Sequence, residues 1–228
     1  MDEIAARLQE IERQLAGHSY CEGRWRPLLA EVRKLPRERR RALAEGLTRV
    51  SDALHRRRGR GTLPVELGVA IALGATALGA GLLRAGLRNG SDAALIAAAA
   101  VWGFAFEPLL KLGVGRLIGV RYSYAYLCGV PRFKMQTGSF VAAPRGARVA
   151  LHLSGTLGSP LGVYLVWRAV PPNLPLAARV CGIAFWATLM NVSTFFFWLA
   201  GVRRLLGIPL RMSSGAAAAE ELLEALSR

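Results

Sequence analysis

Long apolar segments alternate with polar ones along the chain, and four of them have the length of membrane-crossing helices. They cover residues 63–83, 93–110, 149–167 and 180–201. A helix that crosses the hydrocarbon core of a bilayer needs about 20 mostly apolar residues. The pattern therefore predicts a mainly α-helical, polytopic membrane protein whose four transmembrane helices make up a domain over residues 63–203.

The residues before the first span have the period of amphipathic helices. Two sets of apolar residues each show spacings of four, three and four: Ile4, Leu8, Ile11 and Leu15, then Leu43, Leu47, Val50 and Leu54. We expect residues 1–62 to form a basic cytoplasmic hairpin of two antiparallel helices, with a short helical piece near Trp25 between them. Because proline favours the first turn of a helix, the second helix is expected to start after Pro36. Residues 204–228 are expected to form a cytoplasmic C-terminal helix.

The segment between the second and third spans has a different pattern. Three tyrosines alternate with other residues in the two-residue period of a strand: Tyr122, Tyr124 and Tyr126. Phe140 and Val141 are candidates for a return strand. We therefore expect a small β-hairpin at about residues 120–142 on the cytoplasmic side. The alternative is an ordinary loop whose tyrosines lie at the membrane interface.

Small residues in the first two spans allow close approach between helices. Ala75 and Gly79 are four residues apart, and residues 97–100 are all alanine. We expect these positions to serve packing within the four-helix unit rather than a homodimer face. Ser91 and Asp92 precede the second span and are candidate N-caps for it.

The charge is large and unevenly distributed. The chain has 30 Lys and Arg residues against 15 Asp and Glu, a net charge of +15, although 53% of its residues are hydrophobic. Residues 1–62 contain 15 of the basic residues, residues 111–148 contain seven, and the part after residue 201 contains four. By the positive-inside rule, both termini and the central segment are expected in the cytoplasm, in a multi-pass protein of the cytoplasmic (inner) membrane.

Arginines are dense immediately before the first span, at Arg56, Arg57, Arg58 and Arg60. Anionic lipid headgroups attract each such charge by about 1 kcal/mol. Nucleic acid is the other partner that a basic run suggests, but topology and lipid contact already account for this one. A disordered basic tail is excluded by the apolar content. We expect a bilayer with anionic headgroups as a partner, and not nucleic acid.

Five polar residues lie in or beside the spans, where such groups are functional candidates by default. Glu107 and Lys111 are four residues apart and can pair on one helix face. Glu66 is near enough to the interface to stay hydrated. His152 and Asn191 are expected to hydrogen-bond to neighbouring helices. Glu107 and His152 are also the candidate catalytic residues.

The residue types that hold metals and cofactors are scattered. A zinc site needs three ligands of the histidine, cysteine or carboxylate kind. Cys21, Cys128 and Cys181 match no zinc or redox spacing, and the sequence has no phosphate-binding loop, dinucleotide fingerprint or Ser-His-Asp set. We expect no metal and no cofactor.

Residues 107–203 nevertheless carry a recognisable order of elements. Glu107-Pro-Leu-Leu-Lys111 lies on a predicted membrane helix that ends in Gly-Arg-Leu-Ile-Gly-Val at residues 115–120. The tyrosine-rich hairpin follows, then a helix beginning near residues 144–155, then a helix with Asn191. This order resembles the core of the site-2 protease family of intramembrane metalloproteases, in which the first helix bears the zinc-binding motif H-E-x-x-H.

The resemblance implies a degenerate zinc site. Glu107 and Lys111 stand where the family has its two histidine ligands, and Pro108 stands where it has the glutamate. Leu199 stands near the position of the third ligand, an aspartate. The implied protein is an inactive relative that could still hold a transmembrane segment in the groove where a substrate would lie.

Three functions follow from these patterns. The leading hypothesis is a non-catalytic integral membrane protein that binds or scaffolds another membrane protein, or that self-associates. The first alternative is a membrane enzyme acting on lipid or peptide through Glu107 and His152. The second is a small transporter component that uses Glu66, Glu107 and Lys111, although the spans show no internal repeat.

Overall fold

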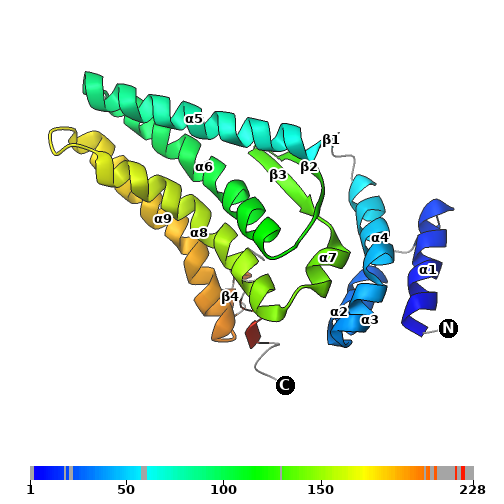
Figure 1. Ribbon diagram of the computed structural model, residues 1–228. Coiled ribbons are helices and arrows are strands. Elements are labelled where there is room, and N and C mark those ends of the chain that lie inside the picture. The colour runs from blue at the N-terminus through cyan, green and yellow to red at the C-terminus, as the bar shows by residue number, and fades with distance from the viewer. Residues whose placement is uncertain are drawn as a thin grey trace.

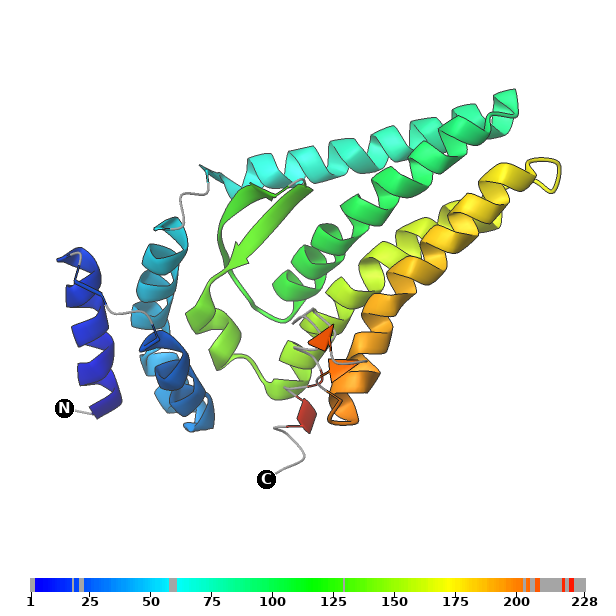
Figure 2. The same ribbon diagram turned by 180° about the vertical axis from the view of Figure 1, so that it is seen from behind.

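The computed structural model describes residues 3–17, 19–20, 23–57, 61–128, 130–202, 204–205, 208–209, 219 and 222–223. The helices are α1 (Glu3–Ala16), α2 (Trp25–Lys34), α3 (Arg37–Ala42), α4 (Ala44–Arg56), α5 (Val65–Asn89), α6 (Asp92–Leu117), α7 (Thr137–Ala142), α8 (Arg145–Ala169) and α9 (Pro175–Leu199). The strands are β1 (Thr62–Leu63), β2 (Tyr122–Cys128), β3 (Val130–Met135), β4 (Arg204–Leu205) and β5 (Ile208–Pro209). The N-terminal helices, the small sheet and the end of α9 lie at one end of the long helices, and the α5–α6 and α8–α9 connections lie at the other (Figures 1 and 2).

Four helices, α5, α6, α8 and α9, are long and apolar enough to span a membrane. This confirms the four apolar helices predicted from the sequence. Each is 25 or 26 residues long, which is longer than the apolar run predicted for it. The difference consists largely of polar helix ends, such as residues 84–89 of α5 and 145–148 of α8. A hydropathy boundary omits these residues because they are charged, yet their backbone continues the helix.

Glycines bring α8 and α6 into close contact. A Cβ atom at Gly158 would lie 2.5 Å from the Cα atom of Glu107, and one at Gly162 would meet the carbonyl oxygen of Trp102. Cβ atoms cannot occupy such positions, so the two backbones approach more closely there than side chains would allow. Small residues at a helix interface are typical of membrane proteins, where close van der Waals packing replaces the hydrophobic effect.

The inner face of α5 packs against α6 in a similar way. Gly79 lies under the indole of Trp102, whose Nε1 donates a 2.9 Å hydrogen bond to the carbonyl oxygen of Thr76. Two turns beyond Gly79, Gly86 packs against Leu95. Gly79 therefore serves packing within the four-helix unit, as expected.

The turns at the far end of the long helices are fixed by two neighbouring side chains. Ser91 is the N-cap of α6, and its hydroxyl accepts a 3.3 Å hydrogen bond from the backbone N–H of Ala94. Asp92 was the other candidate cap for this helix. Its carboxylate instead accepts a 2.7 Å hydrogen bond from the N–H of Ala177, in the first turn of α9. Because the first N–H groups of a helix lack partners within it, Asp92 links the start of α6 to the start of α9.

The sheet has the antiparallel order β1-β2-β3. The predicted hairpin exists, but its return strand ends at Met135. Phe140 and Val141 do not form a strand: they lie in α7 and are buried against the N-terminal helices. An isolated apolar pair fits a strand or a short helix equally well, so its period could not decide between them. The third strand is β1, which precedes α5 and pairs Thr62 with Tyr126.

The N-terminal helices form a three-helix unit. Five of the eight predicted seam residues are buried, together with two residues of α2: Leu8, Ile11 and Leu15, Leu28 and Val32, Leu47 and Val50. The other three, Ile4, Leu43 and Leu54, are partly buried and pack against them. Gly46 packs on Leu8, and Arg49 pairs with Glu12 at 2.6 Å, so α1 and α4 run parallel; Figure 1 shows the same direction. The expected antiparallel hairpin was wrong, because the short piece in the middle, α2, is the returning helix.

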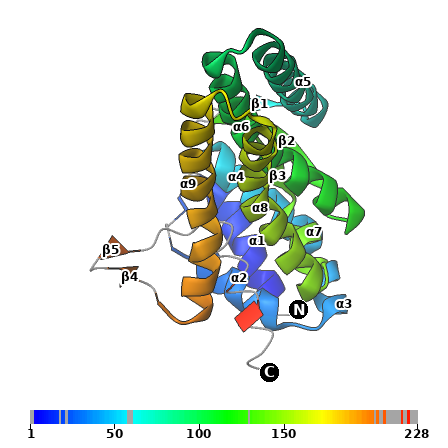
Figure 3. The same cartoon turned by 90° about the vertical axis from the view of Figure 1, so that its left-hand side faces the viewer.

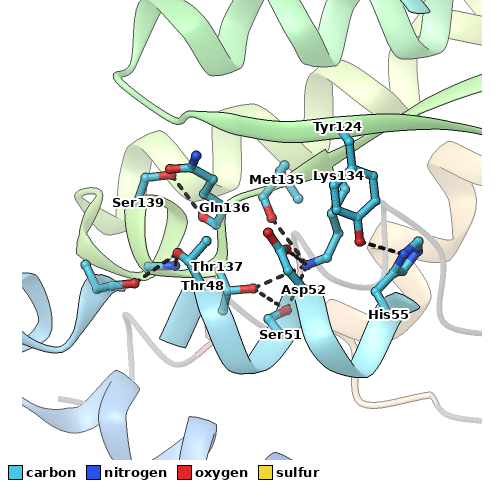
Figure 4. Close-up of polar contacts among 12 residues, drawn as sticks. Thr48, Ser51, Asp52, His55, Tyr124, Lys134, Met135, Gln136, Thr137 and Ser139 are labelled. Atoms are coloured by element: carbon cyan, nitrogen blue, oxygen red, sulfur yellow. Dashed lines mark hydrogen bonds and ion pairs between the residues drawn. The ribbon is translucent and has the colours of Figure 1, made fainter. Parts of the chain in front are cut away.

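Buried polar contacts fix this unit to the sheet and α7 (Figure 4). The ammonium of Lys134 on β3 donates a 2.7 Å hydrogen bond to the Ser51 hydroxyl and lies 3.8 Å from the Asp52 carboxylate, both on α4. The Thr137 hydroxyl donates to Ser51 as well, at 2.7 Å. Burial lowers the pKa of Lys134, and Asp52 opposes that shift. The N-terminal helices are thus attached to the sheet and α7 by a specific network.

The chain beyond α9 begins with a short β-ladder instead of a helix. Gly201, with a φ of 78°, follows the end of α9 in the left-handed conformation that terminates many helices. Strands β4 and β5 then pair antiparallel beyond this end (Figure 3). Since Pro209 lacks an N–H group, it interrupts a helix that would include it. Residues 219 and 222–223 are helical, and the rest of the predicted C-terminal helix lies outside the described residues.

Candidate functional site

The strongest cluster of charge between the long helices is centred on Glu107 of α6. Its carboxylate oxygen lies 3.1 Å from the Lys111 ammonium, one turn along the same helix. The guanidinium of Arg132, on β3, lies 3.6 Å from the same oxygen. About three quarters of the Glu107 and Lys111 side chains is buried, whereas Arg132 is 45% exposed. One carboxylate therefore faces two cations.

The neighbouring helix leaves the space that Lys111 fills. The Lys111 stem lies directly over Gly155 of α8, where any Cβ atom would collide with it. One turn further along α8, Gly158 lies against the backbone of Glu107. Pro108 follows Glu107 inside the helix and has no N–H to donate to the carbonyl oxygen four residues earlier. The ion pair thus lies where α6 is interrupted locally and where the backbone of α8 approaches it closely.

Tyr122 fixes the sheet to this part of α6. Its hydroxyl donates a 2.6 Å hydrogen bond to the carbonyl oxygen of Lys111, and its ring covers Gly115. Burial raises the pKa of the Tyr122 phenol to about 12, so it remains a hydrogen-bond donor at neutral pH. A cavity of about 170 Å³ lies between α6 and the sheet and is lined by Glu107, Lys111, Tyr122 and Arg132, among others.

The other predicted residues are not part of this cavity. His152 lies on α8 nearer the sheet end, and its ring packs edge-on against Phe140 of α7, with ring centroids 5.4 Å apart. Among the described residues its ring makes no hydrogen bond to a neighbouring helix; its contact is aromatic. Glu66 lies in the first turn of α5 and lines a separate open cavity with Arg116 and Arg121. The side chain of Asn191 lies outside the described residues.

The predicted lipid-contact arginines lie partly within the described chain. The Arg56 guanidinium lies 5.6 Å from the centre of the Tyr124 ring, and Arg57 is the C-cap of α4. Arg58 and Arg60 lie outside the described residues. Arg56 thus has a contact within the protein besides any contact with lipid.

Two contributors to these sites could not be recognised from sequence spacing. Arg132 reaches Glu107 only because β3 folds back on α6, 25 residues along the chain. Likewise, the Tyr124 hydroxyl and Nδ1 of His55 are 2.8 Å apart, although 69 residues separate them. Burial raises the pKa of Tyr124 to about 12. The alternating tyrosines were the sequence feature that could have indicated contacts at this sheet. In the structure Tyr124 is buried, and Tyr122 is half-buried against α6.

The chemistry open to the Glu107 cluster is limited by its own charges. A general base needs a lone pair directed at a substrate, and here two cations already face the carboxylate. No group of three histidine, cysteine or carboxylate side chains that could hold a metal occurs among the described residues. Glu107 lines the cavity between α6 and the sheet, whereas His152 does not line it and packs its ring against Phe140.

A second feature lies on the opposite, outer face of α5. Small residues form a stripe along it, at Ala70, Gly74, Ala77 and Gly81. All four are exposed, and a Cβ atom at Gly74 or Gly81 would meet no atom within 4 Å. Leu67 and Leu78, 47% and 58% exposed, rise beside it. We call these four small residues the α5 stripe.

Comparison of the chain with protein-family models, curated proteins and solved structures finds no match.

Proposed function

We propose that this chain is a non-catalytic, multi-pass membrane protein that binds a transmembrane helix of another membrane protein. The four long apolar helices support membrane insertion. Their up-and-down order brings the N-terminal helices, the sheet and the end of α9 to one side. Since 26 of the 30 basic residues belong to the three segments on that side, we assign it to the cytoplasm.

The α5 stripe is the observation that carries this proposal. The inner face of α5 already packs its glycines against α6, whereas Gly74 and Gly81 on the outer face meet no other part of the described chain. Lipid tails gain nothing from a stripe of small residues, whereas a second helix can approach its backbone closely there. The flanking leucines would then pack beside that helix as ridges do in ordinary helix–helix contacts.

Charge at the two ends of the stripe favours a different protein over a second copy. Glu66 is exposed at the cytoplasmic end of α5, and Arg84 and Arg88 are exposed at the other end. Two copies in one membrane have the same orientation, so a contact along this face would place Glu66 near Glu66 and arginine near arginine. Many transmembrane helices carry Lys or Arg at their cytoplasmic end, which complements Glu66. The occupant we propose is therefore a helix of another protein with a basic cytoplasmic end.

The Glu107 cluster supports the absence of catalysis in this proposal. Lys111 fills the space against α8 and pairs with Glu107, where the resemblance to site-2 proteases would put two zinc ligands. An ammonium there repels a divalent cation. The resemblance, if correct, makes the chain an inactive relative whose remaining task is to bind a membrane segment.

Site-specific photo-crosslinking in intact cells tests the proposal. A benzophenone amino acid at Ala77 lies within the stripe, and Gly74→Leu should block it. The matched control, Ala80→Leu, adds the same side chain at an exposed position of α5 outside the stripe. We expect a protein adduct at Ala77 that is lost with Gly74→Leu and kept with Ala80→Leu. Mass spectrometry should place the linked peptide in a membrane helix with a basic cytoplasmic end.

Two results would overturn the proposal. An adduct with a second copy of this chain, or adducts with lipid only, would reject a heterologous helix as the occupant. Stoichiometric zinc in the purified protein would reject the non-catalytic assignment, because Glu107 and Lys111 would then have to be rearranged around a metal.

A further inference from the structure

A large basic cavity lies between the N-terminal helices and the ends of the long helices. Its volume is about 880 Å³. One wall is α3 and α4, with Arg37, Arg41 and Arg49; the second is the turn after α6, with Arg121; the third is the junction of α7 and α8. Two parts of the chain that are distant in sequence therefore bring arginines to one space, and the third wall contributes small and polar residues.

The walls are held by hydrogen bonds that leave the arginine side chains unused. The backbone N–H of Gly138 donates to the Thr48 hydroxyl at 3.1 Å and joins α7 to α4 (Figure 4). The N–H of Arg121 donates to the Ser139 hydroxyl at 3.0 Å, and its carbonyl oxygen accepts from the N–H of Gln136 at 2.9 Å. The turn after α6 is thereby tied to α7, and the cavity is part of the folded structure.

A deeper contact reinforces the same junction. Two buried arginines, Arg40 of α3 and Arg148 of α8, donate to the one carbonyl oxygen of Val141, at 2.9 and 3.1 Å. That carbonyl belongs to the last turn of α7, where the helix dipole is negative and favours cations. The first and third walls are thus joined through α7.

The charges that face the cavity are not balanced within the protein. Arg49 is paired with Glu12. The side chains of Arg37, Arg41 and Arg121 are exposed, and in the described part of the chain they have neither an ion pair nor a hydrogen bond. Glu45 is the acidic residue of the lining. An excess of positive charge therefore remains, on guanidinium groups whose planar fork fits the oxygens of a phosphate.

The position of the cavity indicates the source of that phosphate. Ile118 follows the last residue of α6, Pro144 precedes the first residue of α8, and both line the cavity. Leu117, beside Ile118, is 88% exposed, as expected for a residue in contact with acyl chains. On the membrane placement proposed above, the cavity opens at the depth of the cytoplasmic headgroups. A lipid headgroup can enter it while its acyl chains stay in the bilayer.

We propose that this cavity binds the phosphate-bearing headgroup of an anionic phospholipid from the cytoplasmic leaflet. The site is distinct from the arginines before the first span and from the α5 stripe. It rests on the membrane placement but not on the partner helix. Its role would be to fix the N-terminal unit against the membrane surface at a defined lipid.

Native mass spectrometry of the full-length protein in a neutral detergent tests this proposal. The probes are dihexanoyl phosphatidylglycerol, dihexanoyl phosphatidylcholine and inorganic phosphate. The cavity variant carries Arg37→Gln, Arg41→Gln and Arg121→Gln, all at exposed positions, so folding should be preserved; circular dichroism checks this. We expect phosphatidylglycerol binding to weaken about tenfold or more in this variant. The reason is that the variant loses three arginine charges, each of which attracts an anionic headgroup.

The matched control removes the same charge elsewhere on the N-terminal unit. It carries Arg24→Gln, Arg26→Gln and Lys34→Gln, which are exposed and do not line this cavity. It should bind phosphatidylglycerol like the unaltered protein, as should the α5-stripe variant Gly74→Leu. Equal weakening in both triple variants would overturn the proposal in favour of diffuse surface charge. Phosphatidylcholine binding as tightly as phosphatidylglycerol, or inorganic phosphate displacing the lipid at equal concentration, would overturn it too.

Discussion

The Glu107–Lys111 pair gives the sharpest test of how this protein tolerates charge between its long helices. The perturbation is Lys111→Met, which keeps an unbranched side chain over Gly155 and removes only the ammonium. Afterwards the Glu107 carboxylate, about three quarters buried, retains Arg132 at 3.6 Å as its partner. Because Arg132 is 45% exposed, it compensates for the loss only in part.

The size of the effect follows from distance and burial. At an effective dielectric constant of about 20, two unit charges 4 Å apart attract by roughly 4 kcal/mol, before the cost of removing both from water. Breaking a fully buried pair costs about 3–5 kcal/mol, whereas an exposed pair contributes about 0–1 kcal/mol. With the partial burial of this pair and the remaining guanidinium, we expect Lys111→Met to cost about 2 kcal/mol. Glu107→Gln should cost a similar amount, since it leaves the ammonium without its carboxylate.

The double variant distinguishes a pair from two independent residues. With both charges removed, no uncompensated ion remains, so Glu107→Gln combined with Lys111→Met should cost less than either single change. The assay is thermal unfolding of the purified protein in detergent, followed by tryptophan fluorescence. A loss of about 2 kcal/mol corresponds to a fall in Tm of roughly 4–8 °C for a chain of this size.

Additivity would refute this reasoning. If the double variant loses the sum of the two single losses within about 0.5 kcal/mol, the residues do not act as a pair. A Lys111→Met variant with unchanged stability would also contradict this reasoning, because the Glu107 carboxylate would then need no second cation. The exposed Arg132 serves as a graded control: Arg132→Gln should cost about 1 kcal/mol or less.

Three further predictions concern packing, titration and capping. Gly158→Ala should cost about 1–3 kcal/mol in the same unfolding assay, because its Cβ would lie 2.5 Å from a backbone atom. Gly74→Ala lies in open space and should be neutral or slightly stabilising. Equal losses of stability in the two variants would contradict the close packing at Gly158. Burial raises the pKa of Tyr122 and Tyr124 to about 12, so the folded state keeps phenol protons that the unfolded state releases above about pH 10. Stability should therefore fall between about pH 10 and 12, and absorbance at 295 nm should show two late-titrating tyrosines that are missing when both are replaced by Phe. Asp92→Ala should cost about 1 kcal/mol and increase hydrogen exchange at the start of α9, while unchanged exchange there would reject the cap between helices.

Much of the fold followed from local sequence patterns. The apolar runs determined four long helices, because runs of this length and composition fit helices of membrane-spanning length. The i, i+4 spacing was enough to predict that Glu107 and Lys111 meet. The alternating tyrosines determined β2. The tyrosine pattern could not reveal that β1, 60 residues earlier, would add a third strand. Strand β1 precedes α5 and β2 follows α6, so their pairing depends on how the start of α5 lies beside the end of α6.

The candidate sites depended more on contacts between distant residues. Arg132 became the second cation at Glu107 only through the fold of β3 against α6. The direction of α1 relative to α4 was decided by α2, and Phe140 and Val141 became helical because α7 is buried against the N-terminal helices. Local periodicity carries no information about which of two such arrangements buries more surface.

The two small-residue faces of α5 show the same division most clearly. Composition and spacing determined that α5 is a membrane-length helix rich in glycine and alanine, because both properties are local. Only the tertiary structure decided that Gly79 lies under Trp102 while Gly74 lies in open space. The packing of α6 against α5 determines which side of α5 is buried, and the other side is thereby left exposed.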